Sequence, residues 1–339
     1  MDTTIPTLIA QYDQQVPAPQ LPLPDGATLL QPTTQSTIYE RMFNEDNPQA
    51  WPLPPVGYRM SVLKMILGRL EDAIRDPEED EIMDELVETW GDLITLPKPS
   101  QIQQAQQLGY IKYTAPSPPS QSPSESECEP RTVVTSESRG LILSSGTTGF
   151  RTWEAALHLG TYLSSPSIAD TLIKGKRVLE LGAGTGFVSL FCAKYLGPKR
   201  VVATDREQAL IESIRDCVGR NGIGEEVLVP GIWEWGNEMA VDDGEDGFDV
   251  ALGADLIYDK DLIPLLQSTL TTLFERYNLQ QFIISATLRN EETFQAFLDA
   301  CQMNNFKVER IPFESPPEDK QTGFFHSTSI PIKMFSIRR

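Results

Sequence analysis

Hydrophobic residues recur at helical spacing in two stretches of the first third of the chain. The first stretch is Val62–Leu70 and the second is Ile82–Leu93, with Pro77 between them. This spacing predicts two or three helices between about residues 58 and 108. Residues 1–50, in contrast, are polar and proline-rich and have no clear hydrophobic period, which predicts a flexible arm.

A stretch rich in Pro, Ser and Glu separates this region from the rest of the chain. Residues 114–131 have little apolar surface to bury, so we predict that they form a linker. The chain then divides into a flexible proline-rich arm (1–50), a small helical N-terminal region (51–113), the linker, and an α/β domain (132–339).

Beyond residue 132 short β-rich runs alternate with helical segments. We predict strands at 133–135, 141–143, 177–181, 200–205, 226–230, 248–255, 281–286, 306–311 and 331–339, and helices at 152–163, 186–196, 207–220, 260–277 and 291–304. Such alternation predicts a mostly parallel sheet with helices on both faces. No apolar run reaches the ~20 residues of a membrane span, and the first residues do not resemble a signal peptide.

Charge and cysteine content narrow the function classes. The 339 residues carry a net charge of −20, which repels a phosphate backbone, so we expect no nucleic-acid binding. Eleven carboxylates and one arginine fall within Glu71–Asp92, which predicts a solvated helix face, with a docking surface for a basic partner as the alternative. Four scattered cysteines and two histidines argue against a metal site and favour a reducing compartment.

The segment RVLELGAGTG (177–186) joins a predicted strand to a helix through a glycine-rich turn. Such a turn lets the backbone approach a ligand closely and presents free amides to it. A phosphate-binding loop would need Lys-Ser/Thr where Phe187 and Val188 stand, and a dinucleotide fingerprint would need its third glycine one residue after Gly186. The pattern E-x-G-x-G-x-G, which begins at Glu180, is instead typical of S-adenosylmethionine-dependent methyltransferases.

An acidic residue ends the next predicted strand. Asp205 lies 23 residues after Gly182, where a carboxylate can accept hydrogen bonds from ribose hydroxyls. Helix N-capping is the alternative role. Together the turn and the aspartate predict a cofactor that contains a nucleoside.

Four motifs follow one another along the α/β region: TGFRTWEA (148–155), LELGAGTG (179–186), Trp235-Gly236 and DLIY (255–258). In this series the chain resembles the seven-strand protein-lysine methyltransferases over about residues 133–339. It looks most like the elongation factor 2 lysine methyltransferases, through SSGTTGFRTWEAALHLGTYL and the upstream PPVGY. The resemblance implies a Rossmann-like seven-stranded mostly parallel sheet, S-adenosyl-L-methionine as cofactor, and a lysine of elongation factor 2 as substrate. We expect a cytoplasmic monomer that does not bind membranes.

The resemblance also implies roles for individual residues. The cofactor would be held by Trp153, Gly182, Ala183, Gly184, Asp205, Trp235 and Ala254, with Trp233 as an alternative to Trp235 beside the adenine. Asp255 and Tyr258 would shape the entrance for the target lysine, Asp255 by accepting a hydrogen bond from the amine. The alternative is that Asp255 caps helix 260–277 and Tyr258 packs in the core. We expect His158 to be structural.

Other functions remain open from the sequence. A methyltransferase of the same fold could act on another protein or a small molecule, and a binding module could keep the cofactor fold without transfer. The presence of Asp255 and Tyr258 favours catalysis over the binding module. A nicotinamide oxidoreductase is disfavoured because the glycine spacing does not fit.

Overall fold

Two compact units, Met1–Thr114 and Ala115–Arg339, make up the chain. The computed structural model describes residues 4–97, 108–117, 129–138, 148–239 and 247–339. The strand expected at 141–143, most of the expected linker and the end of the expected helical stretch up to 108 lie outside these described residues.

The first unit is helical. Its elements are α1 (Thr4–Asp13), η1 (Ala18–Gln20), α2 (Gly26–Leu30), α3 (Pro32–Ile38), η2 (Tyr39–Phe43), η3 (Pro48–Ala50), α4 (Val56–Ala73) and α5 (Asp84–Thr95), followed by strand β1 (Gly109–Thr114). Helices α4 and α5 fall on the two hydrophobic stretches noticed in the sequence.

The prediction of a flexible arm is wrong for the described part of residues 1–50. Leu8, Tyr12, Leu29, Ile38 and Phe43 are buried in one core with residues of α4 and α5. The Tyr12 hydroxyl donates a hydrogen bond to the Met42 carbonyl at 2.6 Å, which ties α1 to η2. The helices within residues 1–50 are short, and two of them, α3 and η3, begin at a proline. A hydrophobic period therefore has no room to develop in the sequence, although the assembled helices share a core.

A buried ion pair lies at the end of α1. The Lys112 ammonium is 2.9 Å from Asp13 Oδ2, and it also donates to the carbonyls of Gln49 and Trp51, each at 3.2 Å. Burial raises the pKa of Asp13 to about 7 even though Lys112 opposes the shift. The helical unit therefore contains its own partner for this carboxylate.

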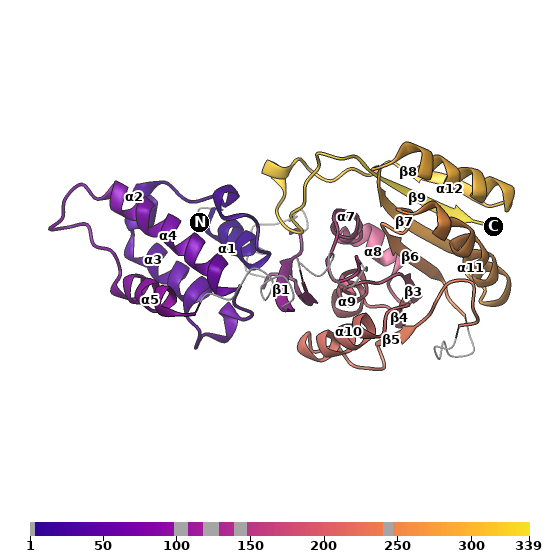
Figure 1. Cartoon of the computed structure of the whole chain (residues 1–339), viewed down its shortest axis with the longest axis horizontal. Coiled ribbons are helices and arrows are strands. Elements are labelled where there is room, and N and C mark those ends of the chain that lie inside the picture. Colours follow the sequence, from indigo (N-terminus) through magenta and orange to yellow (C-terminus); the bar gives the residue numbers. More distant parts are fainter. Residues whose placement is uncertain (1–3, 98–107, 118–128, 139–147, 240–246) are drawn as a thin grey trace. The chain divides into compact units, whose positions relative to one another are not determined.

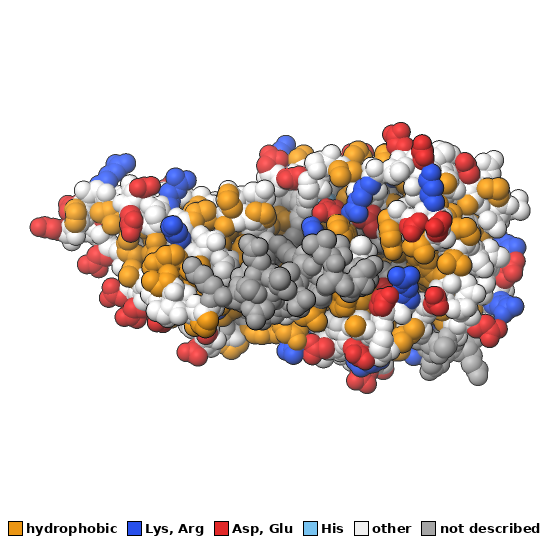
Figure 2. Space-filling view, in the orientation of Figure 1, with side chains coloured by type: hydrophobic (Ala, Val, Ile, Leu, Met, Phe, Trp, Pro, Cys, Tyr) orange, Lys and Arg blue, Asp and Glu red, His pale blue; other side chains and the backbone are white. Residues whose placement is uncertain are grey.

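The acidic stretch Glu71–Asp92 is solvated, as expected, but it is not one helix face, because Asp76–Glu81 lies between α4 and α5. Leu86 faces the core of the unit, whereas every carboxylate of the stretch except Asp80 is exposed. Carboxylates gather on the surface of the helical unit in Figure 2.

The second unit contains a seven-stranded sheet in the order β5-β4-β3-β6-β7-β9-β8, which confirms the predicted fold class. Its strands are β3 (Arg177–Leu181), β4 (Arg200–Asp205), β5 (Leu228–Ile232), β6 (Val250–Ala254), β7 (Gln281–Thr287), β8 (Lys307–Ile311) and β9 (Ile332–Arg338). Strands β3 to β7 are parallel, and β9 runs antiparallel to both β7 and β8. A further strand, β2 (Thr132–Glu137), precedes the sheet in the chain.

Helices pack on both sides of this sheet (Figure 1). They are α7 (Glu154–Leu163), α8 (Pro166–Leu172), α9 (Phe187–Tyr195), α10 (Gln208–Arg220), α11 (Ile263–Arg276, preceded by η6, Lys260–Leu262) and α12 (Glu291–Met303). Helix α7 packs with α9, and α11 packs with α12 over a core shared with the strands. Within the described ranges, no helix is both long enough and apolar enough to cross a membrane.

Candidate active site

A cavity of about 270 Å³ opens where β3, β4 and β6 end. The carboxyl ends of parallel strands meet at one edge of a sheet, which is where open α/β folds bind ligands. All nine residues predicted for the site line this cavity: Trp153, Gly182, Ala183, Gly184, Asp205, Trp235, Ala254, Asp255 and Tyr258. The sequence therefore identified side chains that the fold brings together, although their individual roles stay predictions.

The glycine turn lines the cavity with backbone atoms, because Gly182 and Gly184 have no side chains. Gly182 and Gly184 have φ values of +60° and +54°, a region that L side chains rarely adopt. A Cβ atom on Gly184 would lie 3.0 Å from the Gly149 carbonyl oxygen, so two of the sequence motifs pack directly against each other here. A side chain on this turn would disturb that packing, and its absence leaves the peptide backbone accessible from the cavity.

Asp205 holds the glycine turn in place. Its Oδ2 accepts a hydrogen bond from the Gly184 N–H at 3.0 Å, and its Oδ1 accepts from the Glu207 N–H at 3.3 Å. The N-cap of α10 is Glu207, so Asp205 is not the capping residue, and its carboxylate instead links two loops. Burial raises the pKa of Asp205, while the backbone N–H groups oppose the shift. Each carboxylate oxygen has a second lone pair that can serve a ligand hydroxyl in the cavity.

Glu180 is a lining residue that we did not assign to the site from sequence. It is buried at the end of β3 and accepts hydrogen bonds from the Ser189 hydroxyl and from the Ser189 N–H, the latter at 2.9 Å. Burial raises its pKa to about 7. Its place as the first letter of E-x-G-x-G-x-G was the sequence signal that could have identified it.

Two tryptophans, Trp233 and Trp235, are candidates for the predicted adenine contact, and both line the cavity. Trp233 is buried in the core and donates its indole N–H to the Asn237 carbonyl at 3.0 Å. Trp235 is only partly buried, and its Cζ2 atom lies 3.6 Å from where a Cβ of Gly182 would be. This position over the glycine turn favours Trp235 as the ring that a nucleoside would meet.

The alternatives for Asp255 and Tyr258 are wrong. Asp259, not Asp255, caps the helix that follows, since its side chain accepts from the Asp261 N–H. The side chain of Tyr258 is not in the core, because the residue is 56% exposed at the cavity rim. Asp255 has a φ of +53° and turns its carboxylate toward the end of β7.

Three donors hold the Asp255 carboxylate. The Thr287 N–H donates to Oδ1 at 2.7 Å, while the Thr287 hydroxyl and the Arg289 guanidinium each lie 3.1 Å from Oδ2. Burial raises the pKa of Asp255, and these donors oppose the shift. The carboxylate is therefore fixed in place before any substrate arrives.

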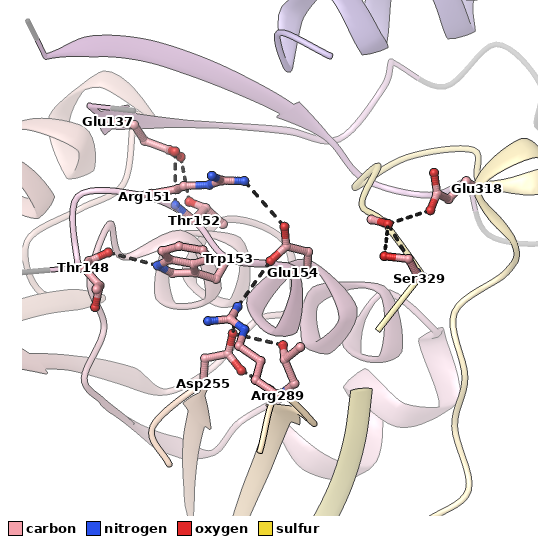
Figure 3. Close-up of polar contacts among 12 residues, drawn as sticks. Glu137, Thr148, Arg151, Thr152, Trp153, Glu154, Asp255, Arg289, Glu318 and Ser329 are labelled. Atoms are coloured by element: carbon pink, nitrogen blue, oxygen red, sulfur yellow. Dashed lines mark hydrogen bonds and ion pairs between the residues drawn. The ribbon is translucent and has the colours of Figure 1, made fainter. Parts of the chain in front are cut away.

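The sequence did not predict the network of ion pairs that lies around Trp153. Arg289 bridges Asp255 and Glu154, at 3.1 and 3.6 Å, and Arg151 lies 3.5 Å from the other oxygen of Glu154. The guanidinium carbons of Arg151 and Arg289 each lie 4.7 Å from the centre of the Trp153 ring. Figure 3 shows the Arg289 guanidinium between the carboxylates of Glu154 and Asp255, beside that ring.

Neither histidine is among the described residues that line the cavity. His158 is buried and its Nδ1 lies 2.7 Å from the Ser315 hydroxyl, while burial lowers its pKa to about 4. His326 Nδ1 donates to the Phe324 carbonyl at 2.7 Å. These contacts agree with the structural role expected of His158.

The lining residues suit the nucleoside part of S-adenosylmethionine. The half-buried carboxylate of Asp205 lies beside the glycine turn, where it can accept hydrogen bonds from ribose hydroxyls. Trp235 offers an aromatic surface beside the same turn.

Comparison with known proteins points the same way. Residues 143–304 match the model of a family described as lysine methyltransferase. The chain is 40% identical over 325 residues to the protein-lysine N-methyltransferase EFM3 of Chaetomium thermophilum, and the match covers 94% of each chain. The chain belongs to the lysine methyltransferase family. It is an S-adenosylmethionine-dependent protein-lysine N-methyltransferase, which excludes the oxidoreductase and the non-catalytic module.

Two other lysine methyltransferases are also similar to this chain. The chain is 26% identical to the human protein-lysine N-methyltransferase EEF2KMT, over 84% of this chain and 80% of the relative. It is 34% identical to the mouse EEF1A lysine methyltransferase 3, over 47% of this chain and 64% of the relative.

Proposed function

We propose that this lysine methyltransferase methylates a lysine side chain of translation elongation factor 2 and acts as a cytoplasmic monomer without binding nucleic acid. The proposal is supported by the motif SSGTTGFRTWEAALHLGTYL and by the match to human EEF2KMT, which extends through most of both chains. The match to the mouse EEF1A lysine methyltransferase 3 spans less than half of this chain. The net charge of −20 supports the absence of nucleic-acid binding.

One observation connects the geometry with lysine transfer: Trp153, Asp255 and Tyr258 lie at one cavity that also contains the glycine turn. A target lysine held by these three residues would place its amine next to the predicted cofactor site. Transfer needs the nitrogen and the methyl carbon about 3–3.5 Å apart and in line. The fixed Asp255 carboxylate would position the amine for this approach.

The amine must lose its proton before it can react. A lysine with a pKa near 10.4 requires about 4–5 kcal/mol to become neutral at pH 7. Desolvation between the rings of Trp153 and Tyr258 would lower that pKa, whereas a lone carboxylate would raise it. Because Thr287 donates a hydrogen bond to each oxygen of Asp255, the effect of this carboxylate on the pKa of the amine is weakened.

The cofactor would be held by the backbone of Gly182–Gly184, by Asp205 through its ribose, and by Trp153, Trp235 and Ala254. When bound, S-adenosylmethionine supplies an electrophilic methyl group. What the chain's own residues contribute is the exclusion of water, the orientation of the two reactants and a path by which the proton leaves to solvent.

The test uses a lysate from cells that lack this protein, incubated with the purified chain and radiolabelled S-adenosylmethionine. We expect a labelled band at the mass of elongation factor 2, confirmed with the purified factor. Gly184→Arg should abolish the label, because the new side chain would press against the Gly149 backbone and displace the glycine turn. The matched control is Gly219→Arg, an exposed glycine of α10 whose Cβ would have nothing within 4 Å. Labelling of elongation factor 1A, or of small molecules alone, would overturn the proposed substrate.

A further inference from the structure

Trp153, Asp255 and Glu154 surround a positive charge at the cavity rim, and that charge belongs to a residue of the chain itself. Arg289 lies with its guanidinium against the Trp153 ring and within ion-pair distance of both Asp255 and Glu154. An aromatic face flanked by two carboxylates is an environment that also suits a lysine ammonium.

The groups around Arg289 do not depend on it for their positions. The Trp153 indole N–H donates to the Thr148 carbonyl at 3.0 Å, and Thr287 holds both oxygens of Asp255. Glu154 stands in the first turn of α7 and is also paired with Arg151. The two carboxylates and the ring would therefore keep their places if the guanidinium left.

Arg289, by contrast, is more exposed than the two carboxylates that it contacts. Its side chain is 40% exposed, and ion pairs with that much exposure contribute little free energy. It borders the main cavity and also a second hollow of about 60 Å³, which is also lined by Asn290, Thr293 and Phe294. Open space therefore adjoins Arg289 in two hollows into which its side chain could be displaced.

We infer that Arg289 is a stand-in for the substrate: its guanidinium occupies the place of the target-lysine ammonium, and the incoming lysine displaces it from Asp255 and Trp153. This inference rests on the proposed lysine-accepting role of the rim. It makes Arg289 a positioning residue that sets how readily a cationic side chain enters. Only a side chain that provides its own positive charge can replace the guanidinium without leaving Asp255 without a cation, so this arrangement selects for lysine over neutral residues.

The test compares wild type with Arg289→Ala, Arg289→Gln and Arg289→Lys. The probe is n-butylammonium chloride, a lysine side-chain analogue, whose binding to the protein saturated with S-adenosylhomocysteine is followed by NMR. We expect the Ala and Gln variants to bind the probe about threefold to tenfold more tightly, and Arg289→Lys to stay near wild type. In parallel, the KM for the protein substrate should fall in the first two variants while the KM for S-adenosylmethionine is unchanged.

Arg151→Ala is the matched control. Arg151 has the same 4.7 Å distance to the Trp153 ring and pairs with Glu154, but its ion pair is not with Asp255. Its removal should leave n-butylammonium affinity within twofold, and Asp255→Asn combined with Arg289→Ala should lose the gain. A merely structural role for Arg289 would instead raise the KM or leave the probe affinity unchanged, and either result overturns the inference.

The two proposals fail separately. If elongation factor 2 is not methylated, the n-butylammonium measurements still decide whether Arg289 occupies a lysine site. If elongation factor 2 is methylated but Arg289→Ala and Arg289→Gln do not tighten probe binding, the stand-in role alone is wrong.

Discussion

Buried carboxylates occur in both units of the chain, but their partners differ. In the helical unit Asp13 meets Lys112, whose ammonium has its three donors directed at Asp13 and two backbone carbonyls. In the sheet unit the buried Glu180 and the half-buried Asp205 accept hydrogen bonds from hydroxyl and backbone N–H groups and line a cavity. The carboxylate of Asp13 is paired with a cation of its own unit, so it supports the fold. The carboxylates of Glu180 and Asp205 lie beside a cavity without such a cation, so their oxygens can still accept hydrogen bonds from a ligand.

The sharpest test of this comparison breaks the pair in the helical unit. Lys112→Met should lower the free energy of unfolding by about 3–5 kcal/mol, because Asp13 is left buried without its cation. Urea unfolding measures the loss, and Asp13→Asn added to Lys112→Met should restore most of it. Calorimetry should give an unchanged affinity for S-adenosylhomocysteine. If cofactor affinity fell together with stability, the division between the two kinds of carboxylate would not hold.

Asp205 should behave in the opposite way. Asp205→Ala removes a charged acceptor worth about 1.5–3 kcal/mol, so the affinity for S-adenosylhomocysteine should fall about tenfold to a hundredfold. Asp205→Asn should lie between, since its amide oxygen can still accept from the Gly184 N–H. Calorimetry on the three proteins checks this order. Equal affinities would show that the carboxylate serves only the turn.

Glu180 provides a test through pH. The ordinary glutamate pKa of 4.5 applies to the unfolded chain, and burial raises the folded value to about 7. Between pH 5 and 7 the folded state therefore keeps a proton that the unfolded state has lost, and stability falls as pH rises, by at most about 1.4 kcal/mol per pH unit. Glu180→Gln should remove this contribution to the slope of stability against pH. Urea midpoints at pH 5, 6 and 7 measure it, and the exposed Glu212→Gln should keep the wild-type slope.

The smallest effect is expected at Tyr258. Because the residue is 56% exposed, Tyr258→Ala should change the free energy of unfolding by no more than about 0.5 kcal/mol. Loss of its ring from the proposed lysine entrance should lower kcat/KM for the protein substrate about twofold to fivefold, the range of an exposed cation–π contact. Tyr258→Phe keeps the ring and should restore transfer. Equal rates in all three proteins would remove Tyr258 from the site.

The sheet unit was predictable because its signals are local. Strand β3 and the glycine turn lie within ten consecutive residues, and Asp205 follows at a spacing that the fold itself dictates. One expected strand, 226–230, is observed two residues later as β5. A run of apolar residues predicts that a strand is present but does not predict where the strand begins and ends.

The helical unit and the charge network were not predictable in the same way. Tyr12 and Met42 are 30 residues apart, and their contact depends on several short helices packing at once. Arg289 reaches Asp255 across 34 residues because the register of β6 and β7 pairs Ala254 with Ser285. Such register follows from three-dimensional packing, and a single sequence does not reveal it.

The place of β9 in the sheet has a consequence for biosynthesis. This strand lies between β7 and β8 and is antiparallel to both, although it is made after them. While the ribosome has not yet released residues 332–338, β7 has an open edge and β8 has no neighbour within the sheet. Open strand edges invite pairing with other chains, so until β9 has paired, the edges of β7 and β8 are exposed to aggregation.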